Sequence, residues 1–477
     1  MNAERREQVR SNALYLRGVR PIDPDEVAEY VEGRPHPAVV RQLLREEAFS
    51  LGLVERDDGT FEPVSEEPIA PDFRGVESFP EEYGRKLEDL LVAEFGAGWP
   101  DGESGEELRE TIRRLKEDYF AQNPVEYDYG VALGYAIYHL PDYYAVVQYV
   151  LAEIAERGLL PRKLRVLDVG AGVGGPALGL HDFLPDDALA EYHAVEPGDA
   201  ADVLAAMLEE TRANFRATVH RETAEAFEPE GEYDLALFAN VLNELDDPEA
   251  VVRKYLDALA PDGSLVAVAP ADKNASIGLR EVERSVADRT TVYSPTLRLW
   301  PGEEPSDRGW SFDVKPDLDV PAFQRRLDEG ARPAGEGGEE RNRTAGDGEF
   351  VNVDVQFSHA VLRTDGVRRR EFTADPERSA KMAEMERHVT ERVNLVAVKL
   401  SRSLSEGETR NDVFKVGDGS EQVGHFAVLT NETSLNRALR DAEYGSLLSF
   451  EDALVLWNED EGAYNLVVDE KTVVDRL

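Results

Sequence analysis

The sequence predicts an α/β fold built on a mostly parallel sheet, and three patterns carry this prediction. The first is residues 164–180, LRVLDVGAGVGGPALGL, where an apolar run, a glycine-rich turn and a helix-periodic segment follow one another. The second is Glu196, an acid that ends the next apolar run. The third is a strand-like run at 233–240, followed after a helical segment by another at 259–268. Strands that alternate with helices are typical of a parallel sheet.

The glycine-rich turn indicates a binding site for an adenosine-containing ligand. Gly170, Gly172 and Gly174 permit backbone angles closed to other residues and let a ligand approach the main chain. The helix that follows offers unbonded N–H groups at its amino terminus. The spacing is not the dinucleotide fingerprint G-x-G-x-x-G, and Asp168 stands two residues ahead of the first glycine. An acid placed like Glu196 accepts both hydroxyls of a ribose, which does not by itself select the cofactor.

The form D-x-G-x-G-x-G resembles motif I of class I S-adenosylmethionine-dependent methyltransferases. The order "YD" strand at 233–240, helix, and LAPDG strand at 259–268 resembles their second half. The resemblance implies a Rossmann-like seven-stranded sheet with S-adenosylmethionine as the cofactor, and an NAD-binding Rossmann fold is the alternative. The residues that the resemblance assigns to the cofactor are Asp168, Gly170, Ala171, Gly172, Gly174, Glu196, Pro197, Glu222, Thr223, Ala224 and Asn240.

Within that set the resemblance implies separate roles. The glycine turn contacts the methionine and ribose portion, and Glu196 takes the ribose hydroxyls. The adenine lies near residues 222–224, which are expected to end a strand that begins at Ala217. Asn240, at the tip of the fourth strand, faces the methyl acceptor and is the candidate catalytic residue, although a helix cap or turn residue is the alternative interpretation.

Four further segments resemble the methyltransferase-like family of small-ribosomal-subunit assembly factors, whose best known member is mitochondrial. They are residues 132–147, 241–245, the stretch from Trp310 to 323–327, and 357–363. The resemblance covers about 130–370 and implies the small ribosomal subunit or its rRNA as partner.

The chain departs from that family at 293–302, where relatives usually place cysteines that hold an iron–sulfur cluster. The chain has no cysteine. We therefore expect no iron–sulfur cluster and no zinc, with ordinary packing in the cluster's place, as in a haloarchaeal-type member without the cysteine cluster. The eight histidines show no metal-ligand spacing and are expected to be structural.

The charge is strongly acidic, with 53 basic and 97 acidic residues and a net charge of −44. The acids are spread along the chain, and the simplest interpretation is a halophilic protein, because at 1 M salt the Debye length is about 3 Å and self-repulsion is screened. Acidity therefore does not argue against an RNA partner. No apolar run of membrane-spanning length and no signal-peptide core are present, so we expect a cytoplasmic protein without a membrane partner.

The sequence predicts four regions. Residues 1–70 contain a winged-helix-like pattern at 21–64 with Asp23 as a cap, for which a small helical packing module is the alternative. A helical region follows at 71–158, the methyltransferase domain at 159–370 and a small, barrel-like β domain at 371–477. Within the third, residues 330–348 are glycine-rich and predict a flexible surface loop.

Three classes of function remain open from the sequence, because no acceptor motif such as N-P-P-Y is present. They are an rRNA methyltransferase, a cofactor-binding but inactive assembly factor, and a small-molecule or protein methyltransferase or DNA-reading regulator. Three basic islands, at 1–20, 109–116 and 361–370, are candidates for phosphate contact. The alternative is that they pair with nearby acids. The candidate residues are Arg5, Arg6, Arg113, Arg114, Arg368, Arg369 and Arg370.

Overall fold

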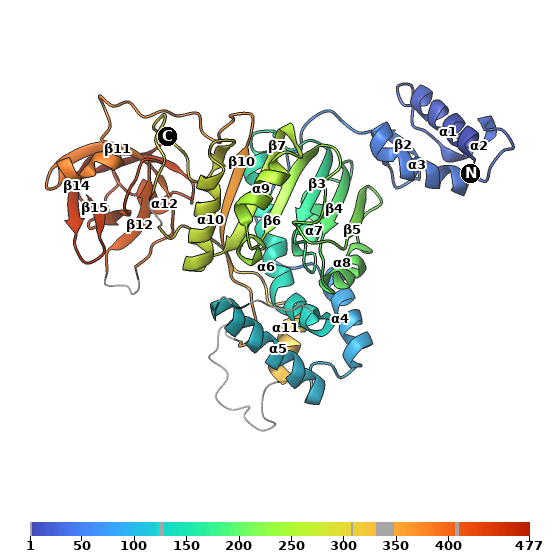
Figure 1. The fold of residues 1–477 in the computed structure, drawn as a ribbon, viewed down its shortest axis with the longest axis horizontal. Helices are drawn as coiled ribbons and strands as arrows, with labels where there is room; N and C mark the ends of the chain where they lie inside the picture. Colours follow the sequence, from blue (N-terminus) through green and yellow to red (C-terminus); the bar gives the residue numbers. More distant parts are fainter. Residues whose placement is uncertain (1, 122, 124–127, 307–308, 331–347, 406–409) are drawn as a thin grey trace. The chain divides into compact units, whose positions relative to one another are not determined.

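The structure, a computed structural model, describes residues 2–121, 123, 128–306, 309–330, 348–405 and 410–477 (Figure 1). Apart from its two ends, the loop predicted at 330–348 lies outside the described residues. The chain divides into two compact units, of which the first is Met1–Ala236 with Asp317–Val353 and the second is Leu237–Pro316 with Asp354–Leu477. Each unit is described by itself.

The first unit begins with three helices and a hairpin. An isolated bridge joins Ile22 to Phe61, and the helices and hairpin share one apolar core. Asp23 caps the second helix as expected, since its Oδ1 accepts from the N–H of Asp25 at 2.9 Å. The elements are α1 (Ala3–Leu16), α2 (Pro24–Tyr30), α3 (Pro37–Leu51), β1 (Leu53–Glu55) and β2 (Phe61–Pro63).

Long helices follow, and one of them packs unusually close to the helix after the glycine turn. A Cβ atom at Gly179 would lie 2.3 Å from the carbonyl oxygen of Tyr144. The missing side chain therefore lets the two helices touch through their backbones. The helices of this unit are α4 (Glu81–Phe95), α5 (Gly102–Ala121), α6 (Tyr129–Ala155), α7 (Gly175–Phe183), α8 (Ala200–Leu208) and α11 (Ala322–Gly330).

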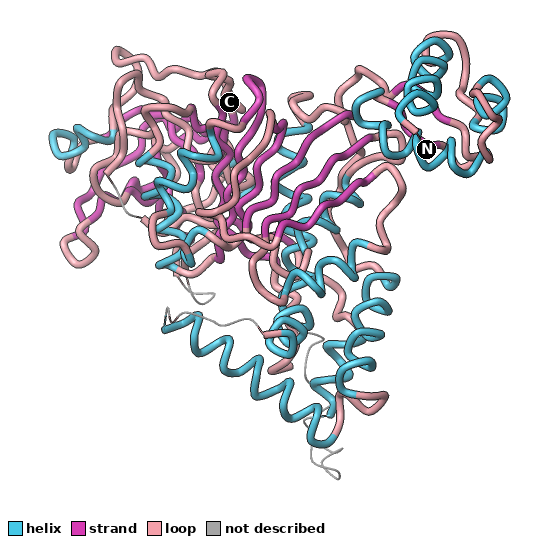
Figure 2. Tube along the Cα trace, turned by 45° about the vertical axis from the view of Figure 1, so that its right-hand side comes forward, coloured by secondary structure: helices cyan, strands magenta, loops and turns pink. Residues whose placement is uncertain are grey.

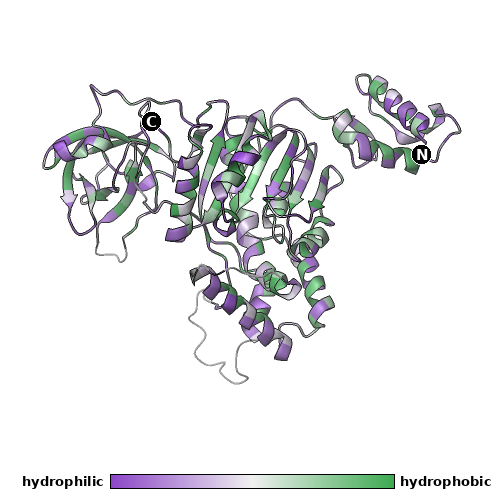
Figure 3. Ribbon diagram, viewed as in Figure 1, coloured by the Kyte–Doolittle hydropathy of each residue, from purple (hydrophilic) through white to green (hydrophobic). Residues whose placement is uncertain are grey.

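The larger sheet has the strand order β5-β4-β3-β6-β7-β10-β8, with β9 paired to β10. Figure 2 draws the strands in magenta. Strands β3, β4 and β5 are parallel and lie in the first unit, and the boundary between the units passes through β6. Figure 3 shows hydrophobic residues concentrated along these strands. The four strands are β3 (Lys163–Val169), β4 (Leu189–Val195), β5 (Phe215–His220) and β6 (Tyr233–Ala239).

In the second unit, β10 runs antiparallel between β7 and β8. It includes the segment 357–363 that the sequence analysis compares with a family strand. Helix α10 packs on β7 and β10. The elements of this part are η1 (Leu242–Glu244), α9 (Pro248–Leu256), β7 (Leu259–Pro270), α10 (Lys273–Ser285), β8 (Thr291–Ser294), β9 (Asp313–Lys315) and β10 (Val355–Arg363).

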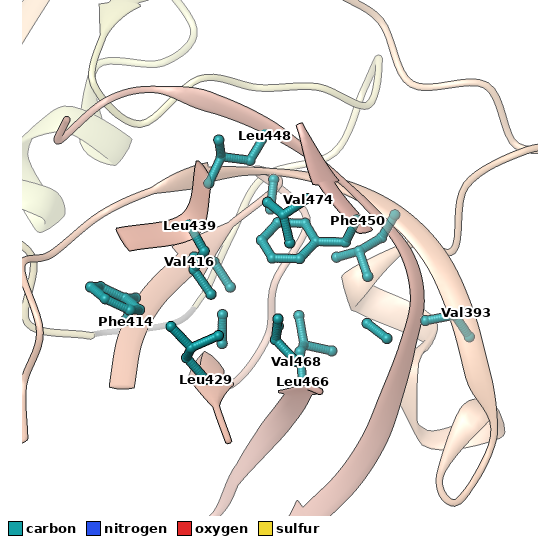
Figure 4. Close-up of a cluster of buried hydrophobic side chains, with 14 of the residues drawn as sticks. Val393, Phe414, Val416, Leu429, Leu439, Leu448, Phe450, Leu466, Val468 and Val474 are labelled. Carbon is teal, nitrogen blue, oxygen red and sulfur yellow. The ribbon is translucent and has the colours of Figure 1, made fainter. Parts of the chain in front are cut away.

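The predicted carboxyl-terminal β domain is confirmed as a barrel-like sheet. Its strands follow the order β11-β12-β13-β15-β14-β16, and an additional β11–β14 pairing closes the first five into a ring. Strands β13 and β15 are parallel. Figure 4 shows the apolar side chains that fill the interior, among them Phe414, Leu448 and Phe450. The elements are η3 (Met382–His388), β11 (Arg392–Lys399), β12 (Asp412–Gly417), β13 (His425–Leu429), α12 (Ala438–Asp441), β14 (Leu447–Asn458), β15 (Ala463–Val468) and β16 (Val473–Arg476).

The segment 293–302 is held by packing, hydrogen bonds and ion pairs inside the second unit. Leu297, Leu299 and Trp300 join a buried cluster with residues of the carboxyl-terminal domain. Trp300 Nε1 donates to Asp418 Oδ2 at 2.7 Å. Ordinary side chains thus anchor this segment.

Candidate functional site

The glycine turn at 170–174 has the backbone that its sequence requires. Gly170, Gly172 and Gly174 have φ values of 69°, 53° and 98°, all in the left-handed region that favours glycine. The N–H groups of Gly170 and Ala171 donate to the carbonyl oxygen of Val195 at 2.8 and 3.2 Å. The turn is therefore tied to the end of β4 at the carboxyl edge of the sheet, where ligands of open α/β sheets bind.

Glu196 directly follows β4, and its carboxylate faces the same turn. Its Oε2 accepts from the N–H of Gly172 and its Oε1 from the N–H of Gly198, both at 3.0 Å. Its own N–H donates to the carbonyl of His220, at the end of β5. Burial raises the pKa of Glu196, and the two backbone N–H groups lower it, with burial the larger effect. Each oxygen keeps acceptor capacity for a ribose hydroxyl, so the residue fits the role that the sequence assigned to it.

Asp168, at the end of β3, is fully buried and only half satisfied. Its Oδ2 accepts from the hydroxyl of Tyr192, whereas its Oδ1 has no hydrogen-bond partner. Burial raises the pKa of Asp168 to about 7, opposed by the Tyr192 hydrogen bond and reinforced by nearby Glu196. Tyr192 is not among the site residues predicted from the sequence, although it lies on β4, the strand that Glu196 follows.

The residues predicted for the adenine lie after a strand that ends earlier than expected. Strand β5 ends at His220, so Glu222, Thr223 and Ala224 belong to the following turn rather than to the strand. Thr223 Oγ1 accepts from the N–H of Ala226 at 3.3 Å, which bends the chain there. Glu222 is exposed, Ala224 is buried, and Pro197 is exposed next to Glu196.

Asn240 lies in the second unit, directly after β6. Its φ is +60°, a region that asparagine tolerates better than most residues. Its N–H donates to the carbonyl of Val268 at 2.9 Å. The side chain is 5% exposed, and neither Oδ1 nor Nδ2 has a partner among the described residues. A buried amide without protein partners is costly, so this amide is free to accept or donate hydrogen bonds to another molecule.

The basic islands make ion pairs within their own units. Arg6 pairs with Glu46 at 2.8 Å, and Arg113 pairs with Glu106 and Glu349 at 3.1 and 2.7 Å. The remaining candidates differ in their contacts. The backbone N–H of Arg5 donates to Asn2 Oδ1, and Arg114 is exposed. The side chain of Arg368 donates to the carbonyl of Arg298. The N–H of Arg369 donates to the carbonyl of Tyr293, and the carbonyl of Arg370 accepts from the N–H of Phe372.

The described residues show neither a metal-binding cluster nor a membrane-spanning helix. In the part of the chain that the structure describes, no group of three or more His, Cys, Asp or Glu side chains is arranged to hold a metal ion. Among the described helices, none has the length and apolar character needed to cross a membrane.

The strand order and the glycine turn define the fold of class I S-adenosylmethionine-dependent methyltransferases, with an additional carboxyl-terminal β domain. Residues 139–314 match a family described as a methyltransferase domain. Residues 6–57 and 383–477 match the amino-terminal and carboxyl-terminal domains of one family, described as a domain of unknown function (DUF8157). The chain thus carries an S-adenosylmethionine-dependent methyltransferase domain between two segments of a second family.

Solved structures similar to this chain are methyltransferases. The plantazolicin methyltransferase BpumL, in complex with SAH, is 14% identical with a TM-score of 0.25, and the match covers 42% of this chain and 66% of that one. The glycopeptide N-methyltransferase MtfA, complexed with S-adenosyl-L-methionine, is 20% identical with a TM-score of 0.22, covering 26% and 50%. The mitomycin 7-O-methyltransferase MmcR is 15% identical with a TM-score of 0.24, covering 56% and 76%. The match thus spans just under two thirds of BpumL, and no curated protein matches the chain.

Proposed function

We propose that this protein is an active S-adenosylmethionine-dependent methyltransferase that works in a salt-rich cytoplasm. The observation that carries the proposal is the glycine turn with Glu196, whose carboxylate is fixed by the N–H groups of Gly172 and Gly198. When bound, the cofactor supplies a methyl carbon already activated by a sulfonium sulfur. The chain's own task is then to orient the cofactor and acceptor and to accept a proton where the acceptor carries one.

The remaining polar groups fit such a ligand. Asp168 Oδ1 in the first unit and the amide of Asn240 in the second are buried and have no hydrogen-bond partner among the described residues. We assign Asp168 to the cofactor side and Asn240 to the acceptor side, as the sequence resemblance implies. The turn residues 222–224 are assigned to the adenine.

Calorimetry in molar potassium chloride tests this function. Wild-type protein is expected to bind S-adenosylmethionine, and Glu196→Ala is expected to weaken binding by about 1.5–3 kcal/mol, the loss of hydrogen bonds to a charged acceptor. The exposed neighbour Pro197 offers a matched control, since Pro197→Ala leaves the carboxylate in place. Absence of binding to the wild type contradicts the proposal, and tight binding of NAD in its place contradicts the cofactor assignment.

A second candidate is a methyltransferase or assembly factor that acts on the small ribosomal subunit. The observation that favours RNA is the carboxyl-terminal barrel, whose five-strand ring, parallel β13–β15 pair and helix α12 between β13 and β14 have the connectivity of an OB-fold. OB-folds bind oligonucleotides or oligosaccharides. The three helices and hairpin of residues 3–63 are compatible with a winged helix, also common in nucleic-acid binders.

The basic islands give this candidate less support, because Arg6 and Arg113 already pair with acids. We propose Arg114, which is exposed, as the first RNA contact to examine. Co-migration of the protein with small ribosomal subunits on a sucrose gradient in molar potassium chloride tests the candidate. Migration with free protein alone contradicts it.

A further inference from the structure

Helix α6 contains a proline-induced break that is repaired by two side chains from far along the chain. Pro141 has no N–H, so the carbonyl of Ile137 loses its helical hydrogen bond. Gln324 of α11 fills the gap, since its Nε2 donates to the Ile137 carbonyl at 2.7 Å. Asn352 Nδ2 donates to the next carbonyl, of Tyr138, at 3.0 Å. The break is therefore held in one geometry by a buried amide, that of Gln324, and a partly buried one, that of Asn352.

The same repair orients a histidine–aspartate pair. His139 Nδ1 lies 3.1 Å from Asp142 Oδ2, and Asn352 Nδ2 donates to that same oxygen at 2.9 Å. Asp142 Oδ1 accepts from the N–H of Tyr143 at 2.8 Å. Because Asp142 fixes Nδ1 as the protonated nitrogen, Nε2 of His139 carries the lone pair. All hydrogen-bond contacts of His139 among the described residues are made at Nδ1.

Tyrosine rings surround this imidazole. Tyr143 is stacked on it with a centroid distance of 5.1 Å and an interplanar angle of 8°. Tyr135 and Tyr138 lie 4.9 and 5.0 Å away, and Tyr119 lies 6.2 Å away. His139 and Tyr143 are only partly buried. Flat, partly accessible aromatic surfaces of this kind favour a planar aromatic ligand.

The pair also lies close to the glycine turn. A Cβ atom at Gly175, the first residue of α7 after the turn, would lie 2.9 Å from Tyr143 Cβ and 3.1 Å from the carbonyl oxygen of Leu140. His139 is one helical turn before Tyr143 on α6. The imidazole and the proposed cofactor turn thus belong to one packed region of the first unit.

We propose that His139 is the base for methyl transfer, and that the acceptor is a planar aromatic ring with a protic oxygen or nitrogen. This rests on the proposed function. The acceptor's O–H or N–H proton goes to His139 Nε2, and Asp142 stabilises the resulting imidazolium as a positioning residue. The new oxygen–carbon or nitrogen–carbon bond forms as the methyl–sulfur bond breaks, and that electron pair stays on sulfur to give a thioether.

Two sources supply such a ring, a nucleobase of rRNA and a small phenol or aromatic amine, and one experiment separates them. Tritiated S-adenosylmethionine is incubated with the full chain and either small-subunit RNA or a panel of phenols and aromatic amines. Wild type, His139→Gln and Asp142→Asn are compared from pH 6.5 to 9.5, with affinity for S-adenosylhomocysteine measured in parallel. His388→Gln, which alters a histidine beside Glu391 in the second unit, is the matched control.

We expect the wild type to label one arm. His139→Gln is expected to lose about 10²–10⁴-fold in kcat at neutral pH, the range for a general base. For a phenol, whose pKa is about 10, the loss shrinks toward pH 9.5, where the acceptor begins to ionise without help. Affinity for S-adenosylhomocysteine stays within twofold of wild type, and His388→Gln behaves as wild type.

Three results overturn the proposal while leaving cofactor binding intact. They are labelling of neither arm by wild type that binds S-adenosylhomocysteine, an unchanged rate in His139→Gln, and, with a phenol, a loss that does not depend on pH. Failure of the wild type to bind S-adenosylhomocysteine is a different outcome, because it removes the proposed function itself.

Discussion

Two buried carboxylates, one in each unit, have opposite surroundings. Glu283 of α10 is 2% exposed and accepts from Arg298 at 2.8 Å, from Thr296 at 2.7 Å and from Arg280. Burial raises its pKa, but the two arginines and the threonine outweigh burial, so the pKa of Glu283 lies below its usual value. Asp168 has one hydrogen bond from Tyr192 and a pKa raised to about 7.

The difference separates a buried acid with a structural role from one that we propose to bind a ligand. Glu283 connects α10 with the segment 293–302, and both of its oxygens accept hydrogen bonds. Asp168 and Asn240 end strands of the sheet with polar atoms that nothing in the described chain satisfies. Unsatisfied buried groups are rare in native proteins, and they gather where binding occurs.

Replacing Glu283, the buried structural acid, is expected to change the free energy of unfolding most. Glu283→Gln leaves buried Arg280 and partly buried Arg298 without their counter-charge, and should lower the free energy of unfolding by about 3–5 kcal/mol. Because the folded-state pKa is lowered, this stabilisation is present above about pH 4.5 and is lost as the pH falls. Urea titrations at pH 7 and pH 4 measure it, with exposed Glu281→Gln as the control on the same helix.

An equal loss in the two variants would remove the structural role of Glu283. A loss that persists at low pH would mean that packing, rather than charge, accounts for it.

Asp168 is expected to make the free energy of unfolding depend on pH. Its folded-state pKa is raised to about 7, so the wild type is penalised progressively as the pH rises from about 4 to 7. Relative to the wild type, Asp168→Asn should therefore gain on the order of 2–4 kcal/mol across that range, at about 1.4 kcal/mol per tenfold change in proton affinity. Urea titrations of both proteins at each pH give the difference.

Tyr192→Phe is expected to change stability at neutral pH in the direction opposite to Asp168→Asn. It removes the hydroxyl that donates to Asp168, so the penalty at neutral pH should grow. A pH-independent difference between Asp168→Asn and the wild type would show that Asp168 stays ionised in the fold.

Replacing Asn240 is expected to change the free energy of unfolding least. Asn240→Gly removes the unpaired amide and suits the φ of +60°, so the free energy of unfolding should stay within about 1 kcal/mol of wild type or rise. Binding of the cofactor or transfer to an acceptor should nevertheless weaken at least tenfold. Asp452→Gly, at an exposed position with a φ of 62°, is the matched control. A large loss of stability without loss of binding would assign Asn240 to the fold alone.

Much of the fold could be predicted because it depends on local patterns. The glycine turn, the apolar strands that follow it and the antiparallel β10 are visible as short runs of residues. Strand β12, with the sequence DVFKVG, was not predicted, because charged residues interrupt its apolar alternation. Lys415 of this strand is nevertheless 3% exposed, with its ammonium over the ring of Phe426 in the neighbouring strand. The residues of the strand itself do not show that contact.

The candidate site was predictable on the cofactor side and not on the acceptor side. Glu196 follows a recognisable strand, so its position could be inferred. His139 and Asp142 are three residues apart on a helix, a spacing that indicates proximity, yet the histidines were expected to be structural. Asn352, which orients both, lies 210 residues after Asp142, and no local pattern connects residues so distant.

The hydrogen bond from α11 to α6 also determines how late in synthesis the first unit can be completed. Gln324 follows Ile137 by 187 residues, so the Ile137 carbonyl has no partner until that much more chain has been made. At roughly 5–20 residues per second, translation of this interval takes on the order of 10–40 s. During that time the emerging chain already contains much of the second unit, which begins at Leu237. The first unit is therefore complete only after residues 237–316 of the second have been made, and no single cut of the gene yields it intact.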